Sequence, residues 1–479
     1  MNYSIIRYVV GWVLKFEAGF LCLPALVGLF YLEQDSLFYL LTAAACLAGG
    51  FFLTLKKPVN RMLYPREGFI IVALSWIVLS LFGAIPFVLT GDIPSYIDAL
   101  FETISGFTTT GASILTNVEA LSYTNLFWRS FTHWIGGMGV FVFILAITPL
   151  LGGSTMTLMK AESPGPSVDK LVPRLKDTSK ILYMIYIALT LVEALLLLCF
   201  GMSPFDAFCT SFGTTGTGGF GIKNDSMAGY APAIQNIVTI FMILSGINYS
   251  VYFLLLRRKL KQALCFEELW WYLGFIAATG GIIFFNIRHL FSTSGEVLRH
   301  TFFQIGSIIT TTGFATTDFN LWPQLSKNCL ILLMFIGACA GSTGGGIKVS
   351  RILILLKSIK KELTSIAHPQ VVTKVRLNGH SVAHEVVRST NVFMTVYLII
   401  LFISVLLVSI EGYDFTTGFT AVVAALNNIG PGLELVGPTG NFAFFSVFSK
   451  LILMLDMLAG RLELIPMLVL LTPSCWKKH

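Results

Sequence analysis

Long apolar blocks separated by short polar stretches dominate this sequence. Blocks such as 69–88, 181–199 and 392–410 contain almost no charged residues. A bilayer core about 30 Å thick requires about 20 apolar residues in a spanning helix. About ten blocks of this length follow one another, so the pattern predicts an all-α, multi-pass membrane protein with ten spanning helices.

The same pattern occurs four times along the chain: an apolar helix, a short amphipathic stretch, a Gly/Thr-rich turn and a second apolar helix. The short stretches begin at Asp98, Asp206, His300 and Thr417, and thirteen positions later each reaches a glycine: Gly111, Gly219, Gly313 and Gly430. A stretch of about ten residues is too short to span the bilayer. Irregular backbone at membrane depth is tolerated only where it is buried in protein or lines a water-filled cavity. We therefore expect four re-entrant half-helices, each ending in a turn inside the protein.

These repeats divide the chain into five parts with no separate soluble domain. Residues 1–60 hold two additional N-terminal transmembrane helices. The four pore repeats occupy 61–160, 161–262, 263–365 and 366–479. The fold class is thus four pseudo-symmetric helix–pore helix–helix repeats around one central pore, preceded by two extra helices.

Four such turns around one axis would form a ring of backbone carbonyls, which can replace the hydration shell of a monovalent cation. Glycine suits the turn because it adopts positive φ and leaves no side chain in the pore. The C-terminal, negative dipole ends of the half-helices would also favour a cation. The candidate filter residues are Thr110, Gly111, Gly218, Gly219, Thr312, Gly313, Ile429 and Gly430. The alternative is that these small residues only pack membrane helices.

Composition and charge exclude several other classes. Hydrophobic residues make up 55% of the chain and charged residues 12%, about half the charged share of a soluble domain. The formal charge is +7, but 23 of the 32 Lys and Arg residues lie in 56–67, 160–180, 257–268, 348–389 and the C-terminus. This asymmetry indicates cytoplasmic loops rather than nucleic-acid binding. The eight cysteines form no CxxC pair, and neither they nor the histidines show metal-ligand spacing.

Two features of the last repeats suggest a gate. The helix expected at about 329–356 contains five glycines, three of them consecutive, and should unwind because each costs about 1 kcal/mol relative to alanine. Arg461 lies within the last apolar block, and an intramembrane charge indicates a functional site by default. We expect Arg461 beneath the filter, as a barrier or latch. The alternative is a structural ion pair with Glu463, Asp456 or Glu193.

The chain resembles the TrkH/TrkG/KtrB superfamily of potassium transporters over nearly its whole length. The motifs that carry the resemblance are the four turns, HWIGGMG (133–139), SGINY (245–249), GACAGSTGGGIK (337–348) and LAGRLELIP (458–466). The resemblance implies a single-chain pseudo-tetramer, a homodimer in the bacterial inner membrane and a cytosolic, TrkA-like nucleotide-binding regulatory partner. It also implies that the 338–347 segment closes the pore below the filter. The candidate gate residues are then Ala338, Gly341, Gly344, Gly345, Gly346 and Arg461.

We predict that the protein is not an enzyme but takes up potassium (with rubidium and sodium as further candidate ions) and holds no cofactor of its own. The basic segments 348–389 and 160–180 are the expected docking surfaces for the partner, although they also fit ordinary cytoplasmic loops. Glu102 and Glu434 could attract cations at the entrance, or could be capping or solvated residues. Alternatives are a proton- or sodium-coupled symporter, which needs titratable groups along the pathway, and a membrane-embedded enzyme, which needs a convergent cluster of acids, histidines or a nucleophile.

Overall fold

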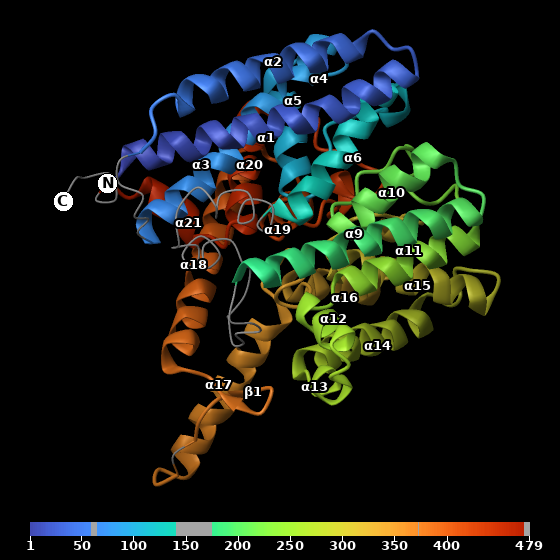
Figure 1. Ribbon diagram of the computed structural model, residues 1–479. Helices are drawn as coiled ribbons and strands as arrows, with labels where there is room; N and C mark the ends of the chain where they lie inside the picture. Colours follow the sequence, from blue (N-terminus) through green and yellow to red (C-terminus); the bar gives the residue numbers. More distant parts are fainter. Residues whose placement is uncertain (59–64, 140–174, 372, 474–479) are drawn as a thin grey trace.

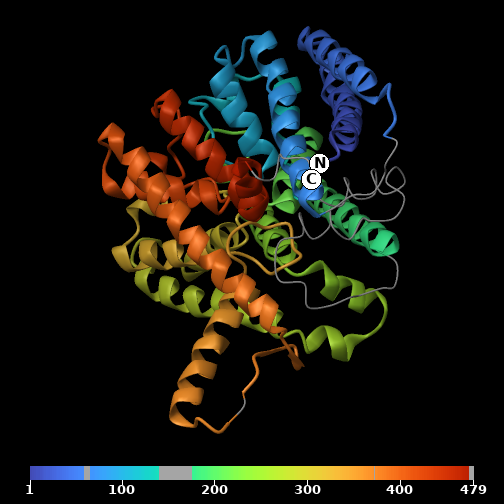
Figure 2. The same ribbon diagram turned by 90° about the vertical axis from the view of Figure 1, so that its left-hand side faces the viewer.

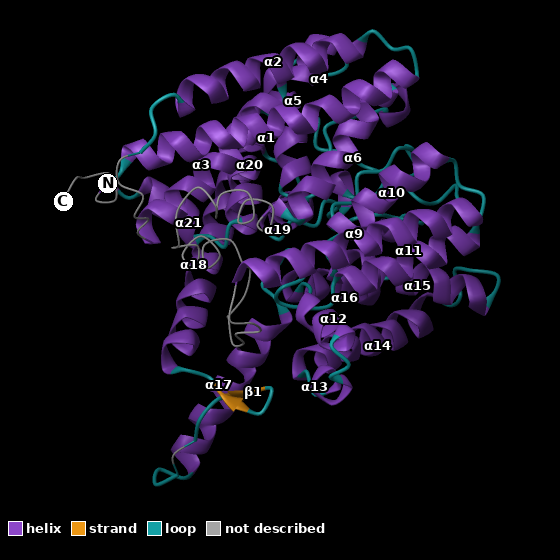
Figure 3. Cartoon of the chain, in the orientation of Figure 1, coloured by secondary structure: helices purple, strands orange, loops and turns teal. Residues whose placement is uncertain are grey.

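The computed structural model of the chain is almost entirely helical, and one small hairpin of β1 (Arg376–Leu377) and β2 (His380–Ser381) is its only sheet within the described residues (Figure 3). The structure describes residues 1–58, 65–139, 175–371 and 373–473. Two N-terminal helices, α1 (Tyr3–Phe30) and α2 (Asp35–Thr54), pack side by side along one flank, where α1 also contacts repeat one (Figure 1).

Each of the four repeats contains an outer helix, a half-helix and a second, inner helix. The outer helices are α3 (Pro65–Gly83) with its extension α4 (Ile85–Thr90), α9 (Leu175–Cys199), α14 (Glu267–Ile287) and α18 (His384–Val408). The half-helices are α5 (Tyr96–Phe107), α10 (Pro204–Gly216), α15 (Ser294–Ile309) and α19 (Phe415–Leu426). The predicted order of elements in the repeats is therefore confirmed.

Each repeat also has a second helix, and those of repeats two to four are interrupted. The second helices are α6 (Tyr123–Gly137), α11 (Pro232–Ser245) with α12 (Tyr249–Leu256), α16 (Gln324–Ile336) with α17 (Val349–Ala367), and α20 (Val447–Arg461) with α21 (Ile465–Leu471). The remaining short elements are α13 (Leu260–Leu264), η1 (Val118–Ala120), η2 (Phe319–Leu321), η3 (Ser409–Glu411) and η4 (Glu434–Val436).

Within the described part of the chain, six helices are long and apolar enough to cross a membrane, or seven if α11 and α12 form one span bent by 90°. They are Tyr3–Phe30, Asp35–Thr54, Arg66–Thr90, Lys180–Cys199, Glu267–Ile287 and His384–Glu411. The chain is a multi-pass membrane protein. The count is lower than the ten predicted spans because the second helices are broken or short, and 140–174 lies outside the described residues.

The four repeats follow one another around a common centre, as the view from one end of the bundle shows (Figure 2). Each second helix contacts its own half-helix and also the half-helix of the next repeat: α6 contacts α10, α11 contacts α15, α16 contacts α19, and α20 contacts α5. The last of these contacts joins repeat four to repeat one. The half-helices are thereby enclosed by inner helices on both sides, which explains how their short, partly polar backbone is buried within the protein.

Candidate ion-binding site

The sequence fixes where each half-helix begins through an N-cap side chain. The cap oxygens of Ser95, Ser203, Thr293 and Asp414 accept the N–H groups of Asp98 (3.4 Å), Asp206 (3.1 Å), Glu296 (3.3 Å) and Thr416 (2.9 Å). In the first three, an acidic residue occupies the third helical position, where it also complements the positive end of the helix dipole. Asp98 and Asp206, the first residues of two of the short stretches identified in the sequence, therefore lie in the first turn of their helices.

All four half-helices end in the same hydrogen-bonded motif. The N–H groups of Thr110, Gly218, Thr312 and Ile429 donate to the carbonyls of Ser105, Gly213, Ser307 and Ala424, at 2.9, 2.8, 2.8 and 2.9 Å. The N–H group of the residue before each of these donors also donates to the backbone carbonyl three positions earlier in the chain, at 3.1–3.2 Å. These two bonds define a Schellman motif, which closes a helix by turning the chain through a left-handed residue. Each half-helix is thus ended in the same way at the same place.

The left-handed residue of this motif is a threonine in three repeats, although glycine is usual there. Thr109, Thr217, Thr311 and Asn428 have φ of 54°, 55°, 60° and 55°. Positive φ is strained for a β-branched residue, and such strain persists only where the surrounding structure enforces it, which is often at functional sites. Sequence reasoning missed these four residues as backbone features. Their signal is a Thr or Asn two positions before each predicted glycine.

The four glycines at the predicted spacing all have positive φ, and each lies in close contact with the backbone of the neighbouring repeat. Gly111, Gly219, Gly313 and Gly430 have φ of 78°, 77°, 90° and 98°. A Cβ on Gly111, Gly219 or Gly313 would collide with the carbonyl oxygen of Gly218, Thr312 or Ile429, and a Cβ on Gly430 would lie 2.7 Å from that of Thr110. Each glycine therefore touches the carbonyl of the next repeat, and the fourth touches the first. The structure brings all eight predicted residues together in one closed ring.

Such a ring offers backbone carbonyls to a cation. A Cβ on Gly111 would also lie 3.7 Å from the carbonyl oxygen of Thr312, which belongs to repeat three. Carbonyl oxygens from different repeats therefore lie close together. Carbonyl oxygens coordinate monovalent cations in place of water. The half-helices also direct their C-terminal ends to this ring, where the partial negative charge favours a cation.

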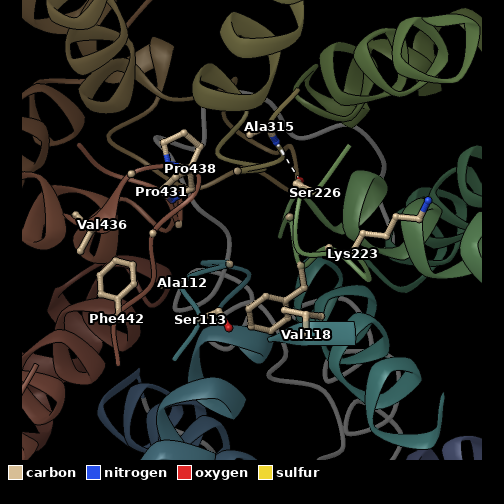
Figure 4. A pocket seen from close by; sticks show the side chains of 18 of the residues that line it. Ala112, Ser113, Val118, Lys223, Ser226, Ala315, Pro431, Val436, Pro438 and Phe442 are labelled. Carbon is tan, nitrogen blue, oxygen red and sulfur yellow. Dashed lines mark hydrogen bonds between the residues drawn. The ribbon is translucent and has the colours of Figure 1, made fainter. Parts of the chain in front are cut away.

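A cavity opens on one side of the ring. Its lining includes the four ring glycines and side chains from all four repeats, which Figure 4 shows arranged around the space. Ala112 and Ser113 come from repeat one, Lys223 and Ser226 from repeat two, and Pro431 from repeat four. This cavity is the open approach to the ring.

The glycine-rich loop 337–348 lies against the other side of the ring. As predicted, the helix is interrupted here, since α16 ends at Ile336 and α17 begins at Val349. The N–H of Gly345 donates to Thr311 Oγ1 at 2.6 Å, and a Cβ on Gly344 would lie 2.8 Å from the carbonyl oxygen of Thr310. Ala338 is fully buried in the same loop. The loop is therefore in direct contact with the residues that precede the ring on this side.

Other predicted gate residues hold the loop in its conformation. Gly341 and Gly346 have φ of 69° and 75°, which only glycine adopts without strain. The carbonyl of Gly341 accepts the N–H of Tyr249 at 3.0 Å, and so connects the loop to the break between α11 and α12. Lys348, which could have extended to the membrane surface, is instead buried and donates to the carbonyl of Gly344.

Arg461 connects this loop to repeat one. Its Nη1 donates to the carbonyl of Thr343 at 2.9 Å, and its Nη2 donates to the carbonyl of Gly136 at 2.6 Å. Of the acids considered as ion-pair partners, Glu463 pairs with Arg351 and Asp456 accepts a hydrogen bond from Ser404 at 2.8 Å. The guanidinium group thus lies between the loop and the C-terminal end of α6.

Two acids have surroundings that the sequence did not reveal. Glu102, considered as an attractor of cations at the entrance, is fully buried and forms an ion pair with Arg129. Glu268, which no sequence pattern indicated as a site residue, is buried. Its Oε1 accepts the N–H groups of Ala340 at 2.7 Å and of Ser350 at 3.1 Å. Glu434 is exposed, as solvation would require.

Four half-helices that end on a closed ring of backbone carbonyls define a membrane protein of the cation-transport class. Comparison with known proteins agrees: the family model TrkH, described as a cation transport protein, matches residues 38–478. The chain belongs to the TrkH family.

Curated relatives and a solved structure match the chain from end to end. The Trk system potassium uptake protein TrkH of Salmonella typhimurium is 38% identical, and TrkG of Escherichia coli is 35% identical, each over 100% of both chains. The crystal structure of the potassium transporter TrkH from Vibrio parahaemolyticus superimposes with a TM-score of 0.87 at 32% identity, and covers 100% of both chains.

Proposed function

We propose that the protein takes up potassium across the bacterial inner membrane through the ring of turns, with the basic loops in the cytoplasm. Thr110, Gly111, Gly218, Gly219, Thr312, Gly313, Ile429 and Gly430 form the potassium-binding selectivity filter. The observation that carries the proposal is the closed ring of glycine-to-carbonyl contacts between successive repeats. The printed names of the relatives, which are potassium uptake proteins, favour potassium as the ion.

In this proposal the loop 337–348 is the gate. Its contacts with Thr310 and Thr311 support this assignment, because an ion that left the ring on that side would meet the loop. Arg461 acts as the latch, because it donates to the loop and to repeat one at the same time. A positive charge at this point also repels a cation that emerges from the ring.

We infer that a cytosolic, TrkA-like nucleotide-binding subunit controls this gate, and that the protein is a homodimer. The gate loop continues directly into α17, which extends away from the body of the protein (Figure 1). Movement of α17 by a partner would therefore be transmitted to the loop. The 348–389 segment is the proposed docking surface, whereas most of the second candidate, 160–180, lies outside the described residues.

A second candidate, proton-coupled symport, is favoured by one observation. Glu17 in α1 and Glu193 in α9 are fully buried in membrane-spanning helices. Ionisable residues at such depth are costly and form the proton relays of many transporters. Neither residue belongs to the ring or to the gate loop, which is why uniport through the ring remains the main proposal.

Rubidium flux into proteoliposomes tests these alternatives. We expect the purified protein to take up rubidium, potassium to compete strongly and sodium weakly, and a pH gradient of either direction to leave the rate unchanged. A rate that follows the pH gradient would support symport. Absence of competition by potassium would contradict the filter assignment.

A further inference from the structure

A buried ion pair lies beside the ring in repeat one. Arg129 Nε and Glu102 Oε1 are 2.5 Å apart, and the two side chains are 3% and 0% exposed. Arg129 also lines the outer cavity that leads to the ring. A fixed positive charge at the approach to a cation site would repel the ion, so the adjacent carboxylate has an electrostatic role as well as a structural one.

Glu102 accepts hydrogen bonds from the segment that follows the first ring glycine. Its Oε2 accepts the N–H of Ile114 at 3.0 Å, and its Oε1 accepts the hydroxyl of Ser113 at 2.9 Å. Arg129 Nη2 donates to the same Ser113 Oγ at 3.2 Å. The ion pair therefore holds residues 113 and 114, which lie two and three positions after Gly111.

The guanidinium group of Arg129 also contacts the segment that follows the second ring glycine, Gly219. Arg129 Nη1 donates to the carbonyl of Gly221 at 2.8 Å, and its guanidinium carbon lies 3.9 Å from the ring centroid of Phe220. Phe220 directly follows Gly219. One guanidinium group thus connects the segments after two neighbouring ring glycines, and its planar fork of N–H donors suits this use better than a lysine ammonium would.

His133, one helical turn further along α6, supports the same turn from behind. The N–H of Phe220 donates to His133 Nε2 at 3.2 Å, so the hydrogen of the neutral ring is on Nδ1, which donates to the carbonyl of Gly106 at 2.8 Å. Residues four apart lie on one face of a helix. Arg129 and His133 together therefore fix the position of Phe220 relative to repeat one.

Among the residues that the structure describes, the other repeats have no equivalent ion pair. The positions that correspond to Glu102 in the repeat alignment are Thr210, Gln304 and Ala421. Arg129 is six positions after the first residue of its helix, and the residues at the same place in α11, α16 and α20 are Val238, Leu330 and Leu453. At these positions of the described repeats, the ring therefore receives charged support only between repeats one and two.

We propose that Glu102 and Arg129 are positioning residues that determine how well the ring discriminates potassium from sodium, by fixing the spacing of its first and second turns. Glu102 also neutralises Arg129 at the approach to the ring. This inference rests on the proposed function, because it assigns a role to the pair only if the ring is the filter.

The test is a comparison of rubidium and sodium uptake by proteoliposomes containing Glu102→Gln, Arg129→Gln, Arg129→Lys and the double variant Glu102→Gln/Arg129→Gln. All four should lose discrimination, with the ratio of rubidium to sodium uptake falling by about tenfold, or about 1.4 kcal/mol. Glu102→Gln should also have the lowest total uptake, since it leaves Arg129 unpaired, whereas the double variant should regain uptake without regaining the ratio.

Asp98→Asn is the matched control, because Asp98 belongs to the same half-helix and pairs with Lys450 at 2.6 Å, far from the turn. It should keep the wild-type ratio. A purely structural role would reduce the yield of folded protein in size-exclusion chromatography and leave the ratio unchanged, and that result would overturn the inference. If the wild type itself does not discriminate, the proposed function fails instead, so the two failures are distinguishable.

Discussion

At the scale of single residues, the ring depends on backbone conformations that most side chains do not adopt. The four glycines were visible in the sequence because their spacing repeats and because glycine tolerates positive φ. The threonines with positive φ could not be predicted in the same way, because a threonine side chain does not favour positive φ. One reason for a threonine is clear at Thr311, whose hydroxyl accepts the N–H of Gly345 in the gate loop. Glycine could not provide this contact.

Replacement of Gly111 by serine should reduce the discrimination between potassium and sodium. The added Cβ would collide with the carbonyl of Gly218 and displace the first and second turns. We expect the ratio of rubidium to sodium uptake in proteoliposomes to fall by at least about tenfold, equivalent to about 1.4 kcal/mol.

Gly91→Ser is the matched control for this change. Gly91 has φ of 83°, similar to that of Gly111, but a Cβ there meets nothing within 4 Å. The control therefore introduces the same backbone strain without contact with the ring. Equal uptake ratios in the two variants would contradict the filter assignment.

At the scale of elements, the repeated amphipathic pattern predicted the half-helices, and the glycine run predicted the break after α16. The conformation of the loop 337–348 was not predictable, because it is set by groups distant in the sequence. Glu268 lies 72 and 82 positions before its two partners, Ala340 and Ser350. In the sequence it appears only as an acidic residue in the first turn of α14. Its neighbour Glu267 pairs with Lys357 on α17, so one turn of α14 contacts both the loop and the helix that follows.

Replacement of Glu268 by alanine should loosen the gate loop. Each buried N–H left without an acceptor costs about 1–3 kcal/mol, and the loop should open locally more often. Cys339 in the loop is fully buried and provides a native probe. We expect its maleimide labelling, measured by mass spectrometry, to accelerate by about tenfold or more, as expected for a loss of about 1.4 kcal/mol.

Glu268→Gln is the conservative control, because the amide oxygen can still accept both N–H groups. Its labelling rate at Cys339 should stay close to that of the wild type. Cys209 in α10 is also fully buried and serves as an internal reference. If both cysteines accelerate together in Glu268→Ala, the whole protein has been destabilised and the specific role of Glu268 is refuted.

At the scale of the whole molecule, the repeats are joined in a closed order, and repeat four meets repeat one. The Nδ2 of Asn428 donates to Thr110 Oγ1 at 3.0 Å, and Lys450 pairs with Asp98. The fourfold sequence repeat predicted the pseudo-symmetric arrangement. It did not predict these contacts, because they involve residues that differ between repeats. Specific departures from symmetry, rather than the repeated pattern, connect repeats four and one: the Asn428 contact lies at the ring, and the Lys450 pair lies at the opposite end of the half-helix.

Among the residues that depart from the fourfold symmetry, Arg461 has the greatest consequence, because it connects three repeats. It belongs to repeat four and donates to Thr343 of repeat three and to Gly136 of repeat one. A hydrogen bond that involves a charged group contributes about 1.5–3 kcal/mol, so Arg461→Ala should free the loop and remove a positive charge from the exit of the ring. We expect rubidium flux without any partner protein to rise by about tenfold, with the potassium-to-sodium ratio unchanged. Arg388→Ala, which removes an exposed arginine, should have no effect. Unchanged flux in Arg461→Ala would refute the latch, whereas a changed ratio would place Arg461 in the filter instead.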